Sequence, residues 1–363
     1  MKKKILIVTS EFPPQPGGIG NHAYHLALYL SKNDYEVTVV ADQRGEEQVE
    51  NRFDAGLPFV VKRIALRHLR LWMYLNRIIE TLKVLKSSDV VIATGKFALW
   101  NVAFCSLFYK FPKMAVIHGT EVNFKSAILK KTIDLSLKRF ESIIAVSHYT
   151  KQLVVHLKRD VHIIPNGIDI SDWLVDNVSK VPLKGSPVLT TVGRVSSRKG
   201  QLQVIRLLPE LKKQFPDLHY HCIGIPTQAE AFLSQAKVLG VDANVTFHGA
   251  VDDATLKASL LATDVFVMLS TESKTGDVEG FGIAILEANA LGVPSIGSKG
   301  CGIQDAINDG VSGFLVDAQD VAAVGASISA LIGHPQIFKS QAEQWAQQHS
   351  WDHIIQQYLI HLP

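Results

Sequence analysis

The sequence predicts an α/β protein made of two doubly wound, parallel-sheet domains. Its 363 residues are more than one ordinary domain holds. Short apolar runs of strand length alternate with segments of helical period along the whole chain, which is typical of βαβ units. The alternation is interrupted at DWLVDNVSKVPLKGSP, residues 172–187, where two prolines and a glycine leave no clear period.

The first domain, expected to span residues 1–173, begins with strands separated by helical segments. Residues 97–109 form an uncharged stretch of 13 residues, which is too short to cross a bilayer and is interpreted as a buried helix. The strands of this domain are expected at Lys4–Thr9, Glu36–Ala41, Asp89–Ala93, Met114–Ile117, Ser142–Val146 and Val161–Ile164.

The pattern restarts after a linker at residues 174–186, and the second domain is expected to span residues 187–345. The chain ends in SWDHIIQQYLIHL, where Ser350 has the side chain of an N-cap and an apolar stripe follows, so a last helix is predicted. The strands of the second domain are expected at Pro187–Val192, His219–Gly224, Val245–Phe247, Val265–Leu269, Pro294–Gly297 and Gly313–Val316.

The composition is that of a soluble enzyme. With 47% hydrophobic and 20% charged residues the chain can bury large cores, and it has no low-complexity tract that would indicate disorder. Doubly wound sheets bind ligands at the carboxyl ends of their strands. Two such domains in tandem leave a cleft between them, so the functional site is expected at their interface.

Positive charge is concentrated in the first half of the chain. Residues 1–173 carry 24 Lys and Arg against 16 Asp and Glu, although the net charge of the whole chain is only +3. Within residues 62–86, seven basic side chains face one acid, Glu80, with aromatic and aliphatic residues between them. Such a surface attracts anionic lipid headgroups or an anionic acceptor, but it is equally a solvated helix face. No nucleic-acid motif accompanies it, so a nucleic-acid partner is not expected.

The cysteines and the N-terminus indicate the compartment. Cys105, Cys222 and Cys301 are odd in number and widely spaced, which indicates neither a disulfide framework nor a zinc site. The apolar block Ile5–Val8 is too short for the core of a signal peptide. We therefore expect a protein of the reducing cytoplasm, with contact at the inner face of the cell membrane if the basic surface binds lipid.

The stretch EGFGIAILE, residues 279–287, predicts a phosphate site at the start of a helix. Its glycines lie where a strand-end loop turns into the helix, and they let backbone N–H groups approach an anion at the positive end of the helix dipole. Glu287, placed two helical turns in and displaced by about 12 Å, would reach hydroxyls on one side of a diphosphate. Glu279, in the loop, would reach hydroxyls on the other side. This spacing suits a nucleotide-diphosphate sugar.

The segment VGRVSSRKG, residues 192–200, is a strand followed by a basic turn. Arg194 and Lys199 would lie at the strand terminus, where two cations can neutralise the charge that builds on a departing diphosphate. Basic loop residues are more often simply solvated. The pairing with residues 279–287 favours the functional interpretation.

A third motif, VIHGTE at residues 116–121, ends an apolar strand with His118 and a glycine that lets the chain turn. A single histidine at a strand end is more often structural. Its position before a glycine at the carboxyl edge of a predicted strand favours a ligand contact.

A glycine-rich loop, PPQPGGIGNH at residues 13–22, opens the first long helix and allows close backbone approach to a substrate. A rival interpretation is an NAD-dependent Rossmann oxidoreductase, because Gly18, Gly20 and Ala23 satisfy G-x-G-x-x-A and Asp42 follows at a suitable distance. Against it, EFPPQP separates the strand from the glycines, whereas the dinucleotide fingerprint needs its turn at the strand end. It also gives no role to residues 192–200 and 279–287.

Taken together, these motifs resemble the retaining glycosyltransferases of family 4, also described as glycosyl transferases group 1. The resemblance covers nearly the whole chain and implies the GT-B architecture, two Rossmann-like domains facing across a cleft, with residues 346–363 crossing back onto the first domain. The E-x7-E block with basic residues upstream is the most specific part. The matching pieces are PGGIG, HGTE, AVSHYT (145–150), IPNGID (164–169), GRVSSRKG, EGFGIAILEANALGVPSIGS and DGVSGFLV (309–316).

The resemblance also implies residue roles. Glu279 would hold hydroxyls of the donor hexose, Glu287 the ribose, and Arg194 with Lys199 the leaving nucleoside diphosphate. His118 would contact the donor sugar near its 6-hydroxyl. The loop from Gly17 to Gly20 would close over the phosphate and acceptor. The other implied positions are Gly18, Gly280, Phe281, Gly282 and Ile283 for the donor, His248 and Gly249 near the base, and Gly17, Gly20, His22 and Glu121 on the acceptor side.

The resemblance implies a metal-independent, retaining transfer in which the leaving phosphate takes the acceptor proton. No D-x-D motif is present, so neither a metal nor another cofactor is expected. The donor is expected to be GDP-mannose or a UDP-linked sugar, and the acceptor a glycan or lipid-linked molecule used in cell-surface polysaccharide or glycolipid synthesis. A GT-B sugar-nucleotide epimerase and a non-catalytic sugar-nucleotide binding protein remain alternatives.

Overall fold

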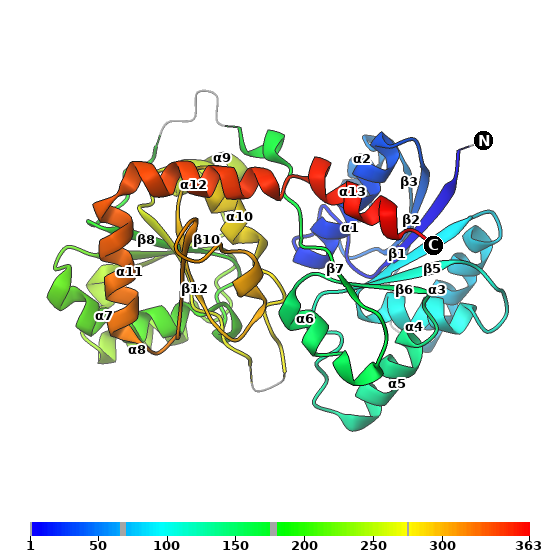
Figure 1. Cartoon of the computed structure of the whole chain (residues 1–363), viewed down its shortest axis with the longest axis horizontal. Coiled ribbons are helices and arrows are strands. Elements are labelled where there is room, and N and C mark those ends of the chain that lie inside the picture. Colours follow the sequence, from blue (N-terminus) through cyan, green and yellow to red (C-terminus); the bar gives the residue numbers. More distant parts are fainter. Residues whose placement is uncertain (1, 66–69, 175–179, 274–275) are drawn as a thin grey trace. The chain divides into compact units, whose positions relative to one another are not determined.

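The protein has two compact units, each built around a parallel sheet (Figure 1). The two-domain α/β organisation predicted from the sequence is confirmed. The first unit ends at Gly167, earlier than the expected residue 173, and it also contains Trp351–Pro363. The second unit comprises Ile168–Ser350. This computed structural model describes residues 2–65, 70–174, 180–273 and 276–363.

The first sheet has seven strands, all paired in parallel. They are β1 (Lys4–Thr9), β2 (Glu36–Asp42), β3 (Val60–Ile64), β4 (Val90–Thr94), β5 (Lys113–Ile117), β6 (Ser142–Ala145) and β7 (His162–Ile163). Their order is β3-β2-β1-β4-β5-β6-β7. The order reverses between β1 and β4, and the loops at the carboxyl ends of these strands therefore diverge and can admit a ligand.

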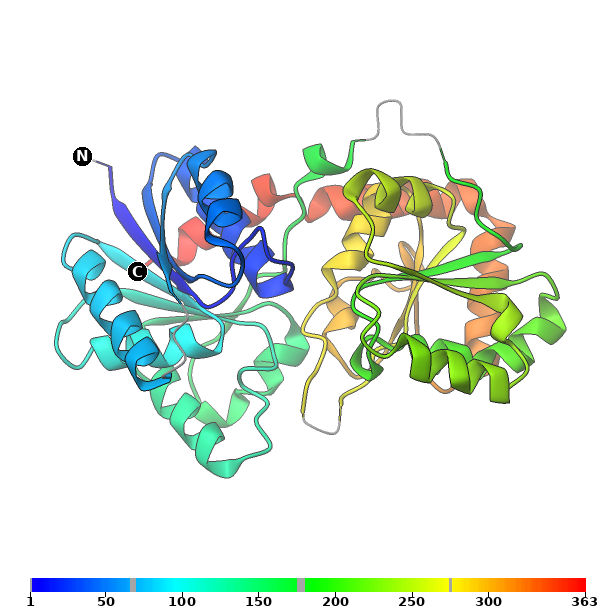
Figure 2. The ribbon, with the colours of Figure 1, turned by 180° about the vertical axis from the view of Figure 1, so that it is seen from behind.

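Helices cover both faces of this sheet (Figure 1 and Figure 2). Strands β4 and β5 are buried along their whole length, which explains why their sequences are continuous apolar runs and not alternating ones. The helices of the first unit are α1 (Gly18–Lys32), α2 (Glu47–Ala55), α3 (Arg70–Leu85), α4 (Lys96–Cys105), α5 (Ala127–Leu137), α6 (His148–Gln152) and α13 (Trp351–His361).

The segment at residues 62–86 differs from the basic helical surface considered above. Lys62 and Arg63 belong to the edge strand β3, which the sequence analysis missed. Arg63 donates two hydrogen bonds to Asp54, of 2.7 and 2.9 Å. Arg77 is buried in α3 and forms a bidentate ion pair with the carboxylate of Asp42. These two cations are neutralised within the domain, so the exposed positive charge of this segment is smaller than its sequence indicates; Arg67 lies outside the described residues.

The second sheet has six parallel strands in the order β10-β9-β8-β11-β12-β13. These are β8 (Val188–Val192), β9 (His219–Ile223), β10 (Val245–Gly249), β11 (Val265–Met268), β12 (Ser295–Ser298) and β13 (Gly313–Val316). The order reverses between β8 and β11, which marks the place where this sheet binds ligands. The helices are α7 (Gln201–Gln214), α8 (Ala229–Val238), α9 (Asp253–Leu261), α10 (Ile283–Ala290), α11 (Val321–Gly333) and α12 (Pro335–Gln348).

The C-terminal helix α13 packs on α1 of the first unit. Trp351 stacks on His25, with ring centroids 5.8 Å apart, and on Tyr29, at 5.9 Å. Helix α12 ends at Gln348, so the expected single helix over residues 346–363 is two helices with a break between them.

Two further expectations concern cysteines and membrane spans. All three cysteines are free and buried. Helix α4 ends at Cys105, so only the first part of the stretch 97–109 is the predicted buried helix. Among the described residues no single helix is long and apolar enough to cross a bilayer, and the pair α11–α12 passes on length and composition only when its two parts, bent by 98°, are taken together.

Candidate functional site

In the second unit, a basic turn is brought against the end of β11. Strand β8 leads through Gly193 and Arg194 into a short helix at Ser197–Lys199, and Gly200 follows. Gly200 has φ of 83°, and a Cβ at this position would lie 2.3 Å from the carbonyl of Leu269, the residue after β11. Only glycine permits this approach, because the contact is with backbone. The basic turn therefore sits at the reversal point of the sheet.

Two cations of this turn converge on Glu279. The Nζ atom of Lys199 lies 2.7 Å, and Nη1 of Arg198 2.5 Å, from the same carboxylate oxygen of Glu279. Burial raises the pKa of Glu279. The charges of Lys199 and Arg198 and their hydrogen bonds lower it by more than burial raises it, so the net shift is downward and the group is ionised. Lys199 and Glu279, both predicted site residues, are thus direct partners.

The basic turn also contains a residue to which the sequence analysis gave no role. Arg198 pairs with Glu279 and lies 3.8 Å from Asp277, whereas Arg194 is exposed and has no ion pair among the described residues. The only available signal was that Arg198 adjoins Lys199 in SSRKG. Sequence alone does not say which of the two arginines turns toward the acid.

Helix α10 begins next to this cluster without a side-chain cap. Gly282 is its N-cap residue, with φ of 94°, and as a glycine it supplies no side-chain cap to the first turn. The N–H groups at the start of the helix, beginning with Ile283, are the donors that an anion can use. The backbone before the helix is fixed because Gly302 donates a 2.9 Å hydrogen bond to the carbonyl of Glu279. A Cβ on Gly302 would clash with the carbonyl of Gly280 at 2.0 Å.

Phe281 and Glu287, two of the predicted site residues near these glycines, have different surroundings. Phe281 is only 1% exposed and contacts the ring of His349, so its side chain belongs to the core and only its backbone can serve a ligand. Glu287 is the fifth residue of α10, about 6 Å along the axis from the first. The expectation of two helical turns and about 12 Å was wrong, because residues 279–282 are not helical.

Glu287 is electrostatically coupled to the same lysine. Burial raises its pKa to about 7, Lys199 opposes this shift, and Asp253 adds to it. Lys199 therefore acts on both acids of the E-x7-E block. This coupling places an acid that ionises near neutral pH beside a fixed cation.

His248 is engaged away from this cluster. Its Nε2 atom lies 2.9 Å from Nδ1 of His221, and the two rings stack at 5.1 Å. The other nitrogen of His221 contacts the carbonyl of Lys184, at 3.0 Å. Gly249 ends β10, and its carbonyl accepts a hydrogen bond from Gly224 at the end of β9. Of the two, Gly249 lies at the carboxyl edge of the sheet, whereas the ring of His248 is held by its neighbours.

In the first unit, His118 follows β5 directly and is 8% exposed. Its Nε2 atom lies 2.8 Å from the hydroxyl of Thr94, the last residue of β4. Burial lowers the pKa of His118 to about 3, so the ring is neutral near pH 7. Glu121 accepts a hydrogen bond from the backbone N–H of His118. Burial raises the pKa of Glu121 to about 7, and its Oε2 atom has no hydrogen-bond partner among the described residues.

His22 connects this site to the C-terminal helix. It lies on α1, and its ring meets the ring of His118 edge to face, with centroids 4.9 Å apart. Its Nε2 atom lies 2.9 Å from the hydroxyl of Tyr358 on α13. Burial, followed by the charges of His118 and His25, lowers the pKa of His22 well below its usual value. The predicted acceptor-side residues His22 and Glu121 thus both contact His118.

The glycines at residues 17–20 lie at the start of α1. Gly18 is the first residue of the helix, so three of the four residues from Gly17 to Gly20, predicted to form a loop, belong to the helix. A Cβ on Gly17 would lie 2.7 Å from the Glu11 carboxylate, and one on Gly20 would lie 3.0 Å from the backbone of the same residue. Gly18 faces open space. Gly17 and Gly20 therefore serve close packing, and Gly18 leaves room beside the helix start.

The NAD-dependent oxidoreductase alternative loses support within the described residues. Asp42, the acid that a dinucleotide-binding domain would use on ribose, is buried and paired with Arg77. No group of three or more His, Cys, Asp or Glu side chains in the described part of the chain is arranged to hold a metal ion.

Two family models together match most of the chain. Residues 16–172 match the model described as Glycosyltransferase Family 4, and residues 176–349 match Glycosyl transferases group 1. The two matches adjoin at the boundary between the predicted domains.

Two similar proteins are a mannosyltransferase and a glycogen synthase. The chain is 27% identical to a GDP-mannose-dependent alpha-(1-6)-phosphatidylinositol monomannoside mannosyltransferase of Mycolicibacterium smegmatis, over 91% of this chain and 90% of the relative. It is 26% identical to a glycogen synthase of Mycobacterium tuberculosis, over 92% of this chain and 86% of that protein.

Solved structures share the fold. Anabaena Alr3699/HepE, in complex with UDP and glucose, superposes with a TM-score of 0.78 at 20% identity, over 99% of this chain and 98% of that chain. Sucrose-phosphate synthase from Thermosynechococcus elongatus gives 0.79 at 17% identity, over 99% and 98%. With both halves matched and the fold shared, the chain belongs to the GT-B glycosyltransferases of family 4, group 1.

Proposed function

We propose that the protein transfers a hexosyl group, mannosyl or glucosyl, from a nucleotide-diphosphate sugar to a glycan or lipid-linked acceptor, with retention of anomeric configuration and without a metal. The observation that carries the proposal is the cluster of Lys199, Arg198 and Glu279 beside the uncapped start of α10. Two cations next to the N–H groups of an uncapped helix start are what a pyrophosphate requires.

The roles of the cluster follow from its charges. Lys199, with Arg194 or Arg198, would stabilise the negative charge on the leaving nucleoside diphosphate. Glu279 is ionised and holds the two cations in place. When donor binds, the same carboxylate would accept hydrogen bonds from the hexose hydroxyls. Glu287, one turn into α10, would accept from the ribose.

No protein base is assigned to the reaction. His118 is neutral and hydrogen-bonded to Thr94, which suits it to contact a sugar hydroxyl, and its low pKa makes it a weak proton acceptor. Glu121 is buried against the backbone of His118 and is suited to hold that segment. We therefore propose that the leaving phosphate takes the acceptor proton. Lys199 and its neighbours would supply the charge that a divalent ion supplies elsewhere.

The substrates are proposed from the relatives. The mycobacterial relative is named for GDP-mannose and a phosphatidylinositol-linked acceptor, and the HepE structure holds UDP and glucose. GDP-mannose and the UDP-linked hexoses are therefore the first donors to test. A lipid-linked acceptor would place the enzyme at the cytoplasmic face of a membrane, with contact through the first domain, including exposed parts of residues 62–86.

The test is a thermal-shift screen of nucleotide sugars, since a ligand that binds only the folded state raises the melting temperature. GDP-mannose, UDP-glucose, UDP-galactose and UDP-N-acetylglucosamine are compared, each with and without EDTA. The expected result is a shift with one nucleotide class that EDTA leaves unchanged and that Glu287→Ala reduces. Slow release of free sugar from that donor, analysed for anomer, then reports turnover.

Two outcomes would overturn the proposal. The absence of a thermal shift with every nucleotide sugar would show that the protein does not bind such a donor. Conversion of a UDP-sugar into its epimer, with no transfer, would assign the protein to the epimerases.

A further inference from the structure

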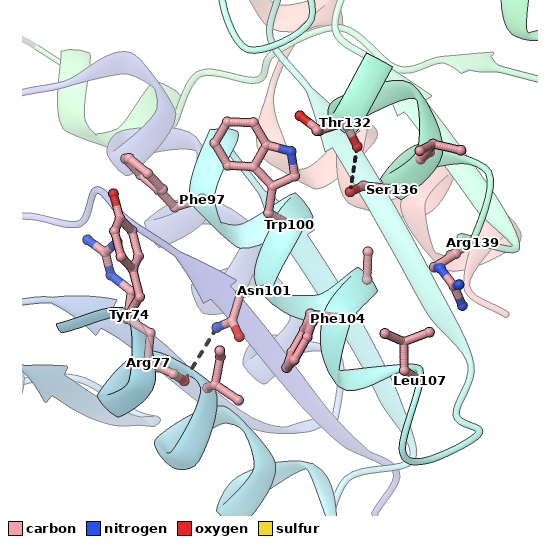
Figure 3. A pocket seen from close by; sticks show the side chains of 13 residues that line it. Tyr74, Arg77, Phe97, Trp100, Asn101, Phe104, Leu107, Thr132, Ser136 and Arg139 are labelled. Carbon is pink, nitrogen blue, oxygen red and sulfur yellow. Dashed lines mark hydrogen bonds between the residues drawn. The ribbon is translucent and has the colours of Figure 1, made fainter. Parts of the chain in front are cut away.

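A cavity of about 490 Å³ lies in the first unit between α3, α4 and α5, separate from the residues assigned above (Figure 3). Its size is within the range of small-molecule sites, about 300–1,000 Å³. Figure 3 shows Tyr74 and Arg139 at opposite ends, with Trp100 and Phe104 between them. Its walls are formed by Tyr74, Arg77, Ile78, Phe97, Trp100, Asn101, Ala103, Phe104, Leu107, Thr132, Leu135, Ser136 and Arg139.

The polar groups of the walls are mostly satisfied within the protein. The amide of Asn101 donates to Thr81 at 2.8 Å, and the hydroxyl of Ser136 donates to the carbonyl of Thr132 at 3.0 Å. The exceptions are Trp100, whose indole N–H is buried, and Arg77, whose Nη1 is buried; neither atom has a hydrogen-bond partner among the described residues. The cavity therefore offers mainly apolar surface, with two unpaired donors, on Trp100 and Arg77, that a ligand oxygen could use.

Apolar side chains continue from the cavity onto the surface. Phe104 is 44% exposed, Leu107 54% and Phe108 62%, and Leu135 on the facing helix α5 is 55% exposed. On the outer face of α3, exposed Trp72, Leu75 and Ile79 form a stripe at the spacing i, i+3, i+7. An exposed apolar surface of this extent is characteristic of an interaction site.

The rim carries positive charge that the protein does not neutralise. Arg139 lines the cavity and is exposed. Lys130 and Lys131, exposed on α5, are not among the lining residues, and none of the three has an ion pair among the described residues. The acids nearby are occupied. Glu80 pairs with Lys83 at 2.7 Å, and Asp134 pairs with His156 at 2.9 Å. The chemistry of the site is thus an apolar cavity and surface beside free cations.

The cavity adjoins the segments that hold His118. Phe97 follows Thr94 by three residues, and Thr94 is hydrogen-bonded to His118. Trp100 stacks on Phe124 with centroids 5.8 Å apart and an interplanar angle of 12°. A ligand in the cavity would therefore contact the elements that form the proposed acceptor side.

We propose that this cavity accepts one hydrocarbon chain of an anionic phospholipid, with the phosphate at Arg139 and the surrounding aromatic surface in the headgroup region of a bilayer. Apolar area and basic residues together are the two contributions that interfacial binding needs. A second copy of the chain is disfavoured as the occupant, because a two-fold contact through this face would bring two positively charged surfaces together. The inference deepens the membrane contact in the proposed function and does not depend on the sugar transferred.

The first experiment measures sedimentation of the full chain with two kinds of vesicle. One is phosphatidylcholine alone, and the other is phosphatidylcholine with phosphatidylglycerol at a molar ratio of roughly seven to three. Leu135→Asp removes apolar rim surface and Arg139→Glu reverses the rim charge. Both positions are exposed, so folding should be retained. Matched controls on the second unit are Val238→Asp, at 80% exposure, and Lys237→Glu.

The wild type and both controls should sediment with the phosphatidylglycerol vesicles, and each rim variant should bind them at least about fivefold more weakly. Equal binding by rim variants and controls would overturn the proposal. So would a dimer in light scattering that Leu135→Asp dissociates, because the surface would then bind a second copy.

A second measurement tests entry of the chain into the cavity. Vesicles whose phosphatidylglycerol carries bromine atoms on the acyl chains should quench the fluorescence of the wild type, and Trp100→Phe should remove part of that quenching. Unchanged quenching in Trp100→Phe would show that the chain stays outside. All variants are also checked for the thermal shift with nucleotide sugar. If the wild type does not bind lipid but shows the thermal shift with nucleotide sugar, only this inference fails. If the wild type binds lipid but shows no thermal shift, only the proposed function fails.

Discussion

The side-chain nitrogen of Lys199 lies 2.7 Å from a carboxylate oxygen of Glu279, and its charge also acts on Glu287. One lysine thus links the two acids that flank the start of α10. These contacts hold the lysine in position, so it need not reorganise to meet the charge of a donor. Such preorganised charge is the arrangement that stabilises a leaving group most effectively.

Replacement of this lysine tests its catalytic role. Lys199→Ala should lower kcat by about 100-fold or more, because charge on the leaving diphosphate would lose its nearest cation. The fold should remain, since Arg198 still pairs with Glu279. Turnover of the donor found in the screen is compared with that of Lys237→Ala, an exposed lysine on α8. A Lys199→Ala enzyme as active as this control would exclude the leaving-group role.

The second acid should make nucleotide binding depend on pH. Glu287 has its pKa raised to about 7 by burial, so its carboxylate, which would accept hydrogen bonds from ribose, forms as pH rises through neutrality. Affinity for UDP or GDP should therefore increase between pH 6 and pH 8 more steeply in the wild type than in Glu287→Gln. Isothermal titration gives the two slopes, and the variant corrects for ionisation of the nucleotide itself. Parallel slopes would count against the ribose assignment.

The strands could be predicted well where burial alone decides them. Strand β1 has the predicted bounds, Lys4–Thr9, because its residues from Ile5 on are buried on both faces and leave a continuous apolar run. Strand β3 was missed for the opposite reason. It lies at the sheet edge, alternates between exposed and buried residues, and contains Arg63. The partner that makes this arginine acceptable is Asp54, and a local pattern does not show it.

The site residues also divide into those that the local sequence predicts and those that depend on the three-dimensional fold. Glycine at residue 282 and the basic turn could be interpreted from their residue types, because a helix start and a cation suit a phosphate in any context. The choice of Arg198 over Arg194 as the partner of Glu279 depends on how the turn folds after Gly200 approaches β11. Likewise, the position of Glu287 depends on where α10 begins, and glycine-rich sequence leaves that open. The structure was therefore needed to show which arginine points toward Glu279 and at which residue α10 begins.

Gly200 should be the least replaceable glycine of the basic turn. Gly200→Ala combines a left-handed φ of 83° with a Cβ 2.3 Å from backbone, and it should displace the turn and strongly destabilise the second unit. The matched control is Gly240→Ala, which has φ of 68° but open space around its Cβ, and which should cost only the conformational penalty of about 1–2 kcal/mol. Thermal unfolding compares the two. Equal loss of melting temperature would mean that packing against Leu269 contributes nothing.

The contact between α13 and α1 should matter for His118. Tyr358→Phe removes the hydroxyl that contacts Nε2 of His22, and leaving a buried nitrogen unpaired costs about 1–3 kcal/mol. Because the His22 ring rests on His118, the variant should also raise the KM for donor or acceptor. Melting temperature and steady-state kinetics measure the two effects. Tyr35→Phe is the control, since that tyrosine lies between α1 and β2 and its hydroxyl makes no hydrogen bond to another described residue. A variant that matches the control in both measurements would show that the C-terminal helix does not position His118.

Glu121 should make stability fall as pH rises. Its pKa is about 7 in the folded protein, raised by burial from 4.5, and the opposing influence of Lys96 does not cancel the shift. Between these two values the folded state binds more protons than the unfolded state, so the stabilisation is complete below pH 4.5 and is lost as pH rises through 7. The difference corresponds to about 3 kcal/mol. Glu121→Gln cannot ionise, and its melting temperature relative to the wild type should rise between pH 5 and pH 8. The exposed Glu46→Gln serves as control and should show no such trend. If the two variants respond alike, Glu121 ionises as freely as a surface carboxylate and the burial argument fails.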